Sequence, residues 1–253
     1  MTALEKINEN ITIINGDCRD ILPDLEHADM VITSPPYNLG VDYDSHDDNM
    51  TRGEYALFAK DVVKNFRLKR GGRVCIEIGG SGRNMPLGYI WQTAAYEAGL
   101  GLFSEIGMQH RKTNPCAWGS YLKADACYTI PNFHMLYVFY KDTDRKKGKE
   151  TTITKNEWVE WTRGWWRINW YENDKRIHPA QFPVQLPTRC MRLFGHKNDL
   201  VIDPFMGLGT TAIACHEQKR RFIGIEKSEK YYGMAKKRIK EKLMQLNLFE
   251  EIL

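Results

Sequence analysis

No stretch of the 253-residue sequence approaches the roughly 20 consecutive apolar residues that a membrane-spanning helix needs. The first ten residues, MTALEKINEN, are polar and lack the apolar segment of a secretory signal. We therefore expect no membrane association and a location in the cytoplasm, where the chain is made.

The sequence also lacks any CxxC pair, although it contains six cysteines. Zinc sites usually show such close spacings, so none is expected. A chain of this length can bury a full hydrophobic core without covalent staples. We expect reduced, mostly buried thiols in a single domain that spans residues 1–253.

A strong charge of either sign is absent as well, since the net charge is only +4. This balance permits a polyanionic partner but does not require one. The charge is uneven along the chain, with a basic segment at 141–149 and an acidic one at 42–48. Each segment taken alone is typical of a solvated loop.

Short strand-like segments and longer segments with helical spacing follow one another along the chain. This order predicts an α/β fold with helices on both faces of a mostly parallel sheet. The expected strands are Ile11–Gly16, Ala28–Thr33, Arg73–Ile78, Leu100–Met108, Phe133–Tyr140, Leu200–Asp203 and Arg221–Glu226. The expected helices are Tyr55–Leu68, Leu87–Ala98, Gln185–Phe194, Thr210–Gln218 and a final helix to about Met244.

Residues from about 142 to 180 interrupt this order. The segment is rich in Trp, Lys and Arg and shows no clear period. Five tryptophans lie within 13 positions: Trp158, Trp161, Trp165, Trp166 and Trp170. Two interpretations stay open, namely an irregular excursion anchored by buried tryptophans and a substrate-contacting insertion over approximately residues 142–177.

Residues 200–226 combine an apolar strand, a Gly-rich turn, a helix, a second strand and an acid at its end. Gly207 and Gly209 allow a tight turn and let a ligand approach the main chain. Glu226, at the end of the second strand, is placed to accept both hydroxyls of a ribose. The glycines could serve helix–strand packing alone, but the whole arrangement favours a site for an adenosine-containing cofactor.

The same turn satisfies the G-x-G-x-x-A pattern of proteins that bind nicotinamide cofactors. The charge of the residues around the turn therefore has to distinguish a nicotinamide cofactor from other adenosine-containing ligands. A pyrophosphate needs amide donors and positive potential at the start of the helix. Asp203 puts a carboxylate at the end of the strand that leads into the turn, which repels phosphates. Because that carboxylate suits ammonium and sulfonium groups, we expect S-adenosylmethionine.

Ser34, Pro35, Pro36 and Tyr37 follow the strand expected at 28–33. The two prolines hold the backbone extended and have no N–H, so the local surface is rich in acceptors. An exocyclic amine that donates to the Ser34 hydroxyl and the Pro35 carbonyl would have its lone pair freed for attack. Tyr37 offers a flat face for an extruded base. For this segment alone, a rigid turn with a core tyrosine is the alternative.

Together, Ser34–Asn38 and Asp203–Thr211 (DPFMGLGTT) resemble the amino-methyltransferase family that modifies adenine N6 or cytosine N4 in DNA. The tetrapeptide precedes the cofactor loop, as in the permuted group called the β class. The resemblance covers nearly the whole chain and implies a Rossmann-like methyltransferase sheet with both motifs at strand carboxyl ends. It implies double-stranded DNA as the substrate, in a prokaryotic cell or a phage-infected host. A cognate restriction endonuclease and a homodimer are left open.

The resemblance also implies roles for individual residues. The catalytic residues would be Ser34, Pro35, Pro36 and Tyr37. The cofactor would be bound by Asp17, Cys18, Ser34, His178, Gln181, Asp203, Pro204, Phe205, Gly207, Gly209, Thr210 and Glu226. Within this set, Asp17 would receive the adenine amino group. The chain has Phe182 where the family usually has a lysine. No metal is expected, because the spacing of the acidic loop Asp42–Asp48 does not fit a Ca²⁺ loop.

The target base is suggested by the first residue of the tetrapeptide. Serine there often accompanies cytosine N4 methylation in this family, and aspartate more often accompanies adenine N6 methylation. Ser34 therefore favours cytosine N4, with adenine N6 as the alternative. Contacts to DNA are expected from basic residues of the irregular segment, with His110–Lys112 as a second candidate. The basic residues meant in the irregular segment are Arg145, Lys146, Lys147, Arg163, Arg167 and Lys175.

Three other functions remain open on the sequence alone. A nicotinamide-dependent oxidoreductase would share the Gly-rich turn but leave Ser34–Tyr37 unexplained. A non-enzymatic DNA-binding protein would have no use for Asp203 and Glu226 at strand ends. A methyltransferase of RNA or of protein glutamine would share the chemistry, because both substrates present planar amines.

Overall fold

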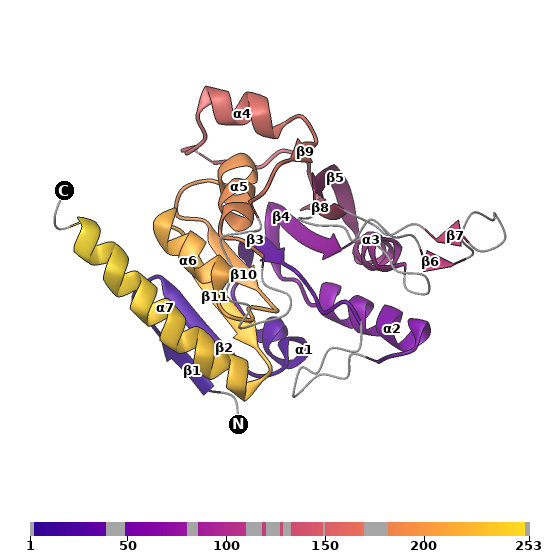
Figure 1. Cartoon of the computed structure of the whole chain (residues 1–253), viewed down its shortest axis with the longest axis horizontal. Helices are drawn as coiled ribbons and strands as arrows, with labels where there is room; N and C mark the ends of the chain where they lie inside the picture. Colours follow the sequence, from indigo (N-terminus) through magenta and orange to yellow (C-terminus); the bar gives the residue numbers. More distant parts are fainter. Residues whose placement is uncertain are drawn as a thin grey trace.

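The computed structural model describes residues 3–38, 49–79, 86–109, 118–119, 127–128, 133–148, 150–169 and 182–250. A nine-stranded sheet forms its centre, in the order β1-β2-β11-β10-β3-β4-β8-β5-β9 (Figure 1). The strands of this sheet are β1 (Ala3–Lys6), β2 (Ile11–Asn15), β3 (Ala28–Thr33), β4 (Leu68–Gly79), β5 (Leu100–Gln109), β8 (Phe133–Lys141), β9 (Trp165–Trp166), β10 (Leu200–Asp203) and β11 (Arg221–Glu226). A separate two-stranded ladder pairs β6 (Trp118–Gly119) with β7 (Cys127–Tyr128).

Helices cover both faces of the sheet. They are α1 (Cys18–Ile21), the 3₁₀ helix η1 (Leu22–Asp24), α2 (Arg52–Val63), α3 (Leu87–Glu97), α4 (Lys155–Trp161), α5 (Gln185–Phe194), α6 (Thr210–Glu217) and α7 (Glu229–Glu250). Figure 1 shows α1, α2 and α3 on one side of the sheet and α5, α6 and α7 on the other. Within the described ranges, no helix has the length and apolar content needed to span a bilayer.

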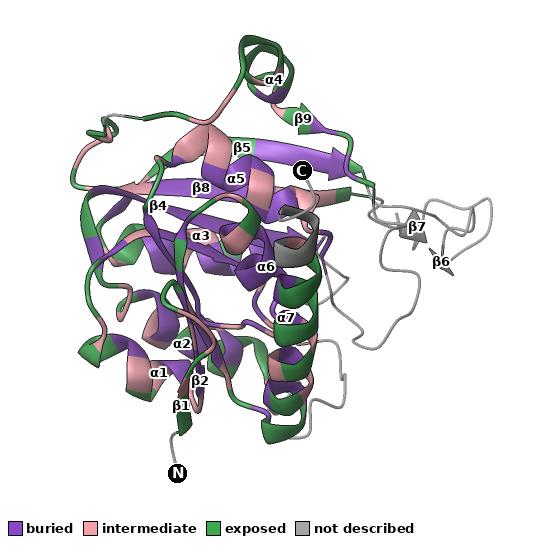
Figure 2. Ribbon diagram, turned by 90° about the vertical axis from the view of Figure 1, so that its left-hand side faces the viewer, coloured by how far each residue is buried: buried purple, intermediate pink, exposed green. Residues whose placement is uncertain are grey.

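The hydrophobic core is divided between these two faces because side chains alternate along each strand. In β3, Met30 and Ile32 join the core that includes α5, α6 and α7, whereas Val31 joins the core with α2 and α3. The strands are accordingly buried between the helical layers, as Figure 2 shows. This arrangement explains why the central strands read as nearly continuous apolar runs.

The order of the strands brings distant parts of the sequence together. Strands β2, β11, β10, β3 and β4 are mutually parallel, and β10 pairs directly with β3 through Val201–Met30 and Ile202–Val31. Strand β8 is antiparallel to both β4 and β5. The carboxyl ends of β3 and β10 therefore lie next to each other at one edge of the sheet.

The expected elements are present, with differences at their ends. Helix α2 begins at Arg52, because Thr51 and Glu54 form a reciprocal capping box, and it ends at Val63. The residues after α2, from Leu68 on and including Gly71 and Gly72, belong to β4, which therefore begins earlier than the strand expected at Arg73–Ile78. The last helix continues past Met244 to Glu250.

The irregular segment contains a short helix that its sequence did not predict. Helix α4 begins after Thr154, which forms a second capping box with Glu157. Trp161 and Trp166 are buried, and the indole N–H of Trp166 donates to the Trp161 carbonyl at 2.8 Å. The expectation of an excursion anchored by buried tryptophans is correct for these two residues.

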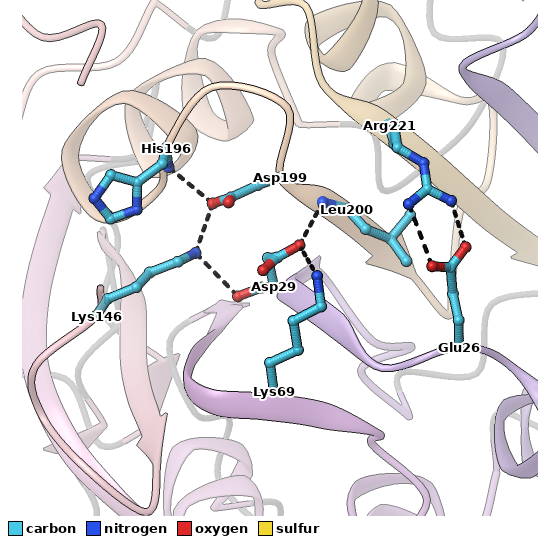
Figure 3. A network of polar contacts seen from close by, with 8 residues as sticks. All are labelled: Glu26, Asp29, Lys69, Lys146, His196, Asp199, Leu200 and Arg221. Carbon is cyan, nitrogen blue, oxygen red and sulfur yellow. Dashed lines mark hydrogen bonds and ion pairs between the residues drawn. The ribbon is translucent and has the colours of Figure 1, made fainter. Parts of the chain in front are cut away.

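A network of charged side chains holds the edge of the sheet where β3, β4 and β10 begin (Figure 3). The Lys146 ammonium donates to the Asp199 carboxylate at 2.6 Å and to the Asp29 carbonyl at 3.2 Å. The Asp29 carboxylate accepts from Lys69 at 2.7 Å and from the Leu200 amide at 2.9 Å. The side chains of Lys146 and Asp199 are each only 9% exposed.

This network corrects one expectation about DNA contacts. Burial lowers the pKa of Lys146, although the negative charge of Asp199 opposes that effect. The charge of Lys146 is paired with Asp199 inside the protein, at the edge of the sheet opposite the carboxyl ends of β3 and β10. It is therefore a residue of the fold, and the expectation that it contacts DNA was wrong.

Lys146→Ala is expected to lower the free energy of unfolding by about 3 kcal/mol, because it leaves a buried carboxylate without its cation. Urea unfolding measures this change. The exposed neighbour Lys147 provides the control, and its replacement by alanine should shift stability by no more than about 0.5 kcal/mol. A Lys146→Ala protein of normal stability with weakened DNA binding would contradict this assignment.

Candidate active site

The two segments singled out in the sequence meet at Asp203, the last residue of β10. Its carboxylate accepts hydrogen bonds from the Thr33 hydroxyl at 2.8 Å, the Thr211 hydroxyl at 2.6 Å and the Phe205 amide at 3.1 Å. Thr33 is the last residue of β3, directly before Ser34. The side chain of Asp203 thus joins the end of β3 to the Gly-rich turn, and it is fully buried.

The Gly-rich turn runs from Pro204 to Gly209, where α6 begins. Gly207 and Gly209 have positive φ angles of 53° and 75°, which glycine adopts without strain. A Cβ atom on Gly209 would also lie only 2.5 Å from Ile239 of α7. The turn requires this conformation at both glycines, and at Gly209 helix α7 packs closely as well, in place of the helix–strand packing that was expected.

Glu226 ends β11, the neighbour of β10, and its carboxylate faces the same turn. It accepts from the Gly207 amide at 2.9 Å and from the Ser228 amide at 2.9 Å. A carboxylate offers about four lone-pair positions, so both oxygens keep capacity for further donors. Glu226 therefore meets the requirement for binding vicinal hydroxyls beside the turn.

The electrostatics of these two acids suit a cationic ligand. Burial raises the pKa of Asp203 to about 6. Burial also raises the pKa of Glu226 to about 7, and the nearby charge of Asp203 adds to the increase. Among the residues that the structure describes, no basic side chain forms an ion pair with either acid. A ligand with ammonium and sulfonium charges would compensate them, so the residues fit S-adenosylmethionine.

Asp17 and Cys18 lie at the same edge, directly after β2. Asp17 caps α1, and its carboxylate accepts from the Arg19 guanidinium at 2.7 Å and lies 3.2 Å from the Lys227 ammonium. Burial works to raise the pKa of Asp17, but these cations hold it well below its usual range. Cys18 is buried, and burial raises the pKa of its thiol to about 12, so the thiol stays protonated.

The tetrapeptide is fixed by side chains from three other elements. The Tyr55 hydroxyl of α2 donates to the Pro36 carbonyl at 2.5 Å, and Trp91 of α3 donates to Tyr55 at 3.0 Å. The Tyr37 hydroxyl donates to Glu77 of β4 at 2.7 Å and lies 3.2 Å from the Ser34 hydroxyl.

The ring of Tyr37 lies over Gly79, where a Cβ atom would come within 2.9 Å of it. Tyr37 is half-buried overall and packs against the core that includes α2 and α3, so the core tyrosine of the alternative interpretation stays open. Its hydroxyl is held on the inside while part of the residue stays accessible. This arrangement leaves Tyr37 able to present a surface to a base.

Glu77 and His134 were missed by the sequence analysis. Glu77 is 2% exposed, and its carboxylate contacts Nδ1 of His134, which lies on the neighbouring strand β8. The available signal was an acid inside the apolar strand sequence RVCIEI. Glutamate is almost never fully buried unless it is paired, so its position in a central strand indicates a partner.

The remaining cofactor candidates divide into two groups. Pro204, Phe205 and Thr210 lie in or beside the turn, and the Phe205 ring packs against Phe58 and Trp91 with centroids 5.9 and 6.4 Å apart. The other candidates, His178 and Gln181, lie outside the described residues. So do Asp42–Asp48, His110–Lys112, Trp170 and Lys175.

Sequence comparison connects this geometry with known enzymes. Residues 28–237 match the model of a family described as DNA methylase. Type II methyltransferase M.MjaVI of Methanocaldococcus jannaschii is 36% identical over 177 residues, covering 64% of this chain and 86% of that protein. Type II methyltransferase M.MjaI of the same organism is 29% identical over 292 residues, covering 92% of this chain and 94% of its own.

Solved structures of methyltransferases share the fold of this chain. A putative DNA modification methylase from Thermus thermophilus, complexed with S-adenosyl-L-methionine, has a TM-score of 0.69 at 25% identity and covers 90% of this chain and 94% of its own. PvuII DNA methyltransferase, described as cytosine-N4-specific, has a TM-score of 0.68 at 20% identity and covers 93% of this chain and 92% of its own. These likenesses confirm the expected Rossmann-like methyltransferase sheet. With a family match that includes both strand ends of the site, the chain belongs to the DNA methylase family of N6 and N4 amino-methyltransferases.

Proposed function

We propose that this enzyme methylates the N4 amino group of cytosine in double-stranded DNA. The observation that carries the proposal is the Thr33–Asp203 hydrogen bond, which places Ser34 and the Gly-rich turn at one edge of the sheet. Ser34, rather than an aspartate, begins the tetrapeptide and supports cytosine as the base. Membership of the family removes the oxidoreductase and the non-enzymatic binding protein as alternatives.

The donor is S-adenosylmethionine, on which this family depends. When bound, it supplies a methyl group activated by a sulfonium. In our proposal Glu226 holds the ribose hydroxyls beside Gly207, and the charges of Asp203 and Glu226 favour the cationic part of the ligand. Asp17, Cys18, Pro204, Phe205, Gly209 and Thr210 complete the cofactor site from the same edge, together with His178 and Gln181.

The base is proposed to enter from the side of the tetrapeptide. The Ser34 hydroxyl and the Pro35 carbonyl accept the two N–H groups of the exocyclic amine, so the nitrogen lone pair becomes available. Pro36 keeps this backbone rigid, since Tyr55 holds its carbonyl. Tyr37 stacks on the base after it has been extruded from the duplex.

We propose that the segment 142–177 includes the surface that recognises the target sequence. Arg189 of α5 lies 5.1 Å from the Trp161 ring and 5.6 Å from the Trp166 ring, which anchors α4 and β9 on the domain. Trp158 and Trp165, by contrast, are 55% and 50% exposed. Strand β9 pairs with Gly107 and Met108 of β5, near the end of the sheet that carries His134.

A cytoplasmic location, a cognate restriction endonuclease and a homodimer stay predictions of the sequence analysis. The names of the Type II relatives support the endonuclease, because Type II methyltransferases are named as parts of restriction–modification systems.

Nucleosides from duplex DNA treated with the enzyme and S-adenosylmethionine are expected to contain N4-methylcytosine. Mass spectrometry after complete digestion measures this product. RNA and a protein extract serve as parallel substrates and should remain unmodified. N6-methyladenine without N4-methylcytosine would replace cytosine by adenine as the target.

Tyr37→Ala is expected to lower turnover roughly 10- to 100-fold, because base–aromatic stacking contributes about 1–3 kcal/mol. The dissociation constant for S-adenosylmethionine, measured by calorimetry, should change less than about twofold. Tyr89→Ala removes an exposed tyrosine from α3 and should leave both quantities unchanged. Equal losses of turnover and cofactor affinity in the Tyr37 variant would place this residue in the cofactor site.

Affinity for S-adenosylmethionine is expected to fall at least about tenfold between pH 8 and pH 5.5. Glu226 and Asp203, with pKa values of about 7 and about 6, gain protons in this range. Each protonation removes a negative charge that favours the cationic ligand. Calorimetry at several pH values measures the effect.

Asp203→Asn should weaken binding at pH 8 and flatten the pH dependence, because the amide cannot ionise. Asp20→Asn, which changes an exposed acid of α1, should reproduce the original curve. An affinity that stays constant down to pH 5.5 would show that these charges do not attract the cofactor.

A further inference from the structure

Helix α7 contacts the Gly-rich turn through two successive residues. The Arg238 guanidinium donates through one nitrogen, Nη1, to the Leu208 carbonyl at 2.7 Å and to the Thr210 hydroxyl at 3.3 Å. The next residue, Ile239, lies so close to Gly209 that a Cβ atom there would come within 2.5 Å of it. The second half of the turn is therefore held by side chains of α7.

The first half of the turn is held by β11 instead. The Met206 amide donates to the Ile225 carbonyl at 2.9 Å, and the Gly207 amide donates to the Glu226 carboxylate at 2.9 Å. Both bonds use main-chain donors of the turn and attach it to the neighbouring strand. The peptide that follows Leu208 lies beyond them.

Glycine at position 209 allows that peptide to rotate. Gly209 has a φ of 75°, and glycine adopts positive and negative φ about equally well. In the present orientation the Gly209 amide donates to the Met206 carbonyl at 2.9 Å, while the Leu208 carbonyl accepts from Arg238. Rotating the peptide by half a turn would break both bonds and point the Leu208 carbonyl at the Met206 carbonyl. Arg238 therefore stabilises one of two orientations that the glycine permits.

The charge of Arg238 alone does not account for its place beside the turn. Burial lowers the pKa of its guanidinium, and no acid among the described residues adds an opposing effect. Arginine nevertheless stays charged in proteins. A positive charge beside a site for a cationic ligand works against binding. Hydrogen bonds from a charged donor are roughly twice as strong as neutral ones, so Arg238 is suited to fix a carbonyl.

We propose that Arg238 is a positioning residue for the cofactor, because it holds the Gly-rich turn in the conformation that binds S-adenosylmethionine; this inference rests on the cofactor site of the proposed function. Without the guanidinium, a fraction of the molecules would have the rotated peptide after Leu208. The measured dissociation constant equals the intrinsic one divided by the fraction in the binding conformation, so it would rise. Once the cofactor is bound, the turn has its binding conformation and methyl transfer proceeds at the original rate.

Two other roles for Arg238 make different predictions. If Arg238 only docked α7 on the domain, its loss would lower the free energy of unfolding, and the folded molecules would bind the cofactor with the original dissociation constant. If Arg238 acted through its charge alone, its loss would strengthen the binding of a cationic ligand. The positioning role predicts weaker binding by molecules that are folded.

The test is calorimetric titration of Arg238→Met with S-adenosylmethionine in the absence of DNA. Methionine keeps an unbranched apolar stem and removes the hydrogen-bond donors. The dissociation constant is expected to rise at least about tenfold, as for the loss of a hydrogen bond from a charged donor, with unchanged stoichiometry. The single-turnover rate of methyl transfer at saturating cofactor should stay within about twofold of the original. Lys237→Met makes a similar change on a side chain that is 78% exposed and should leave the dissociation constant unchanged.

The positioning role is overturned if folded Arg238→Met binds the cofactor with the original constant or more tightly. It is also overturned if the rate at saturating cofactor falls by as much as the affinity. Circular dichroism checks that each variant folds, and Arg238→Gln, with the same expectations, replaces a methionine variant that does not fold.

Arg238→Lys keeps a charged donor and is expected to bind the cofactor more tightly than Arg238→Met or Arg238→Gln. The reverse order would overturn the role of the hydrogen bond. If the unsubstituted enzyme binds no S-adenosylmethionine, the proposed cofactor site fails first. An enzyme that binds the cofactor equally well with and without the Arg238 guanidinium loses only the positioning role.

Discussion

The hydrogen bond between Thr33 and Asp203 is the interaction on which the site depends. It links the last residues of two adjacent parallel strands whose positions in the sequence are 170 residues apart. A buried carboxylate is costly unless its oxygens find donors, and here they receive two hydroxyls and one amide. The same three bonds shape the turn before α6, fix the start of the tetrapeptide and set the distance between them.

Acidic side chains have different partners at the two ends of the strands. Where β3, β4 and β10 begin, acids are paired with lysines and the network is closed. Where the strands end, Asp203 is buried and Glu226 half-buried without such partners among the described residues, and their pKa values rise. Protein stability alone does not explain carboxylates kept in this state. A cationic ligand can compensate the negative charges of these two acids at the carboxyl ends of the strands.

Much of the fold could be predicted because alternation and turn residues report local structure directly. The strands that border the site were correct within a few residues, since each is an apolar run that ends in Pro, Gly or an acid. Helix α4 was missed, because its buried residue, Trp161, packs against Arg189 and Arg192 of α5, which lies about 30 residues further along the sequence. Glu77 escaped notice for a similar reason, since its partners Tyr37 and His134 are brought to it by sheet pairing. The permuted order of the β class stays a prediction.

The position of Arg189 has a consequence for how such an enzyme changes its target during evolution. Its guanidinium lies against the Trp161 and Trp166 rings, and its Nη2 donates to the Arg167 carbonyl at 3.2 Å. These anchoring contacts lie on the inner side of the α4–β9 segment. Its outer side, which includes the exposed Trp158, takes no part in them. If this segment recognises the target sequence as proposed, substitutions on that outer side can accumulate at little energetic cost, and sequence preference can diverge while the methyl-transfer chemistry stays constant.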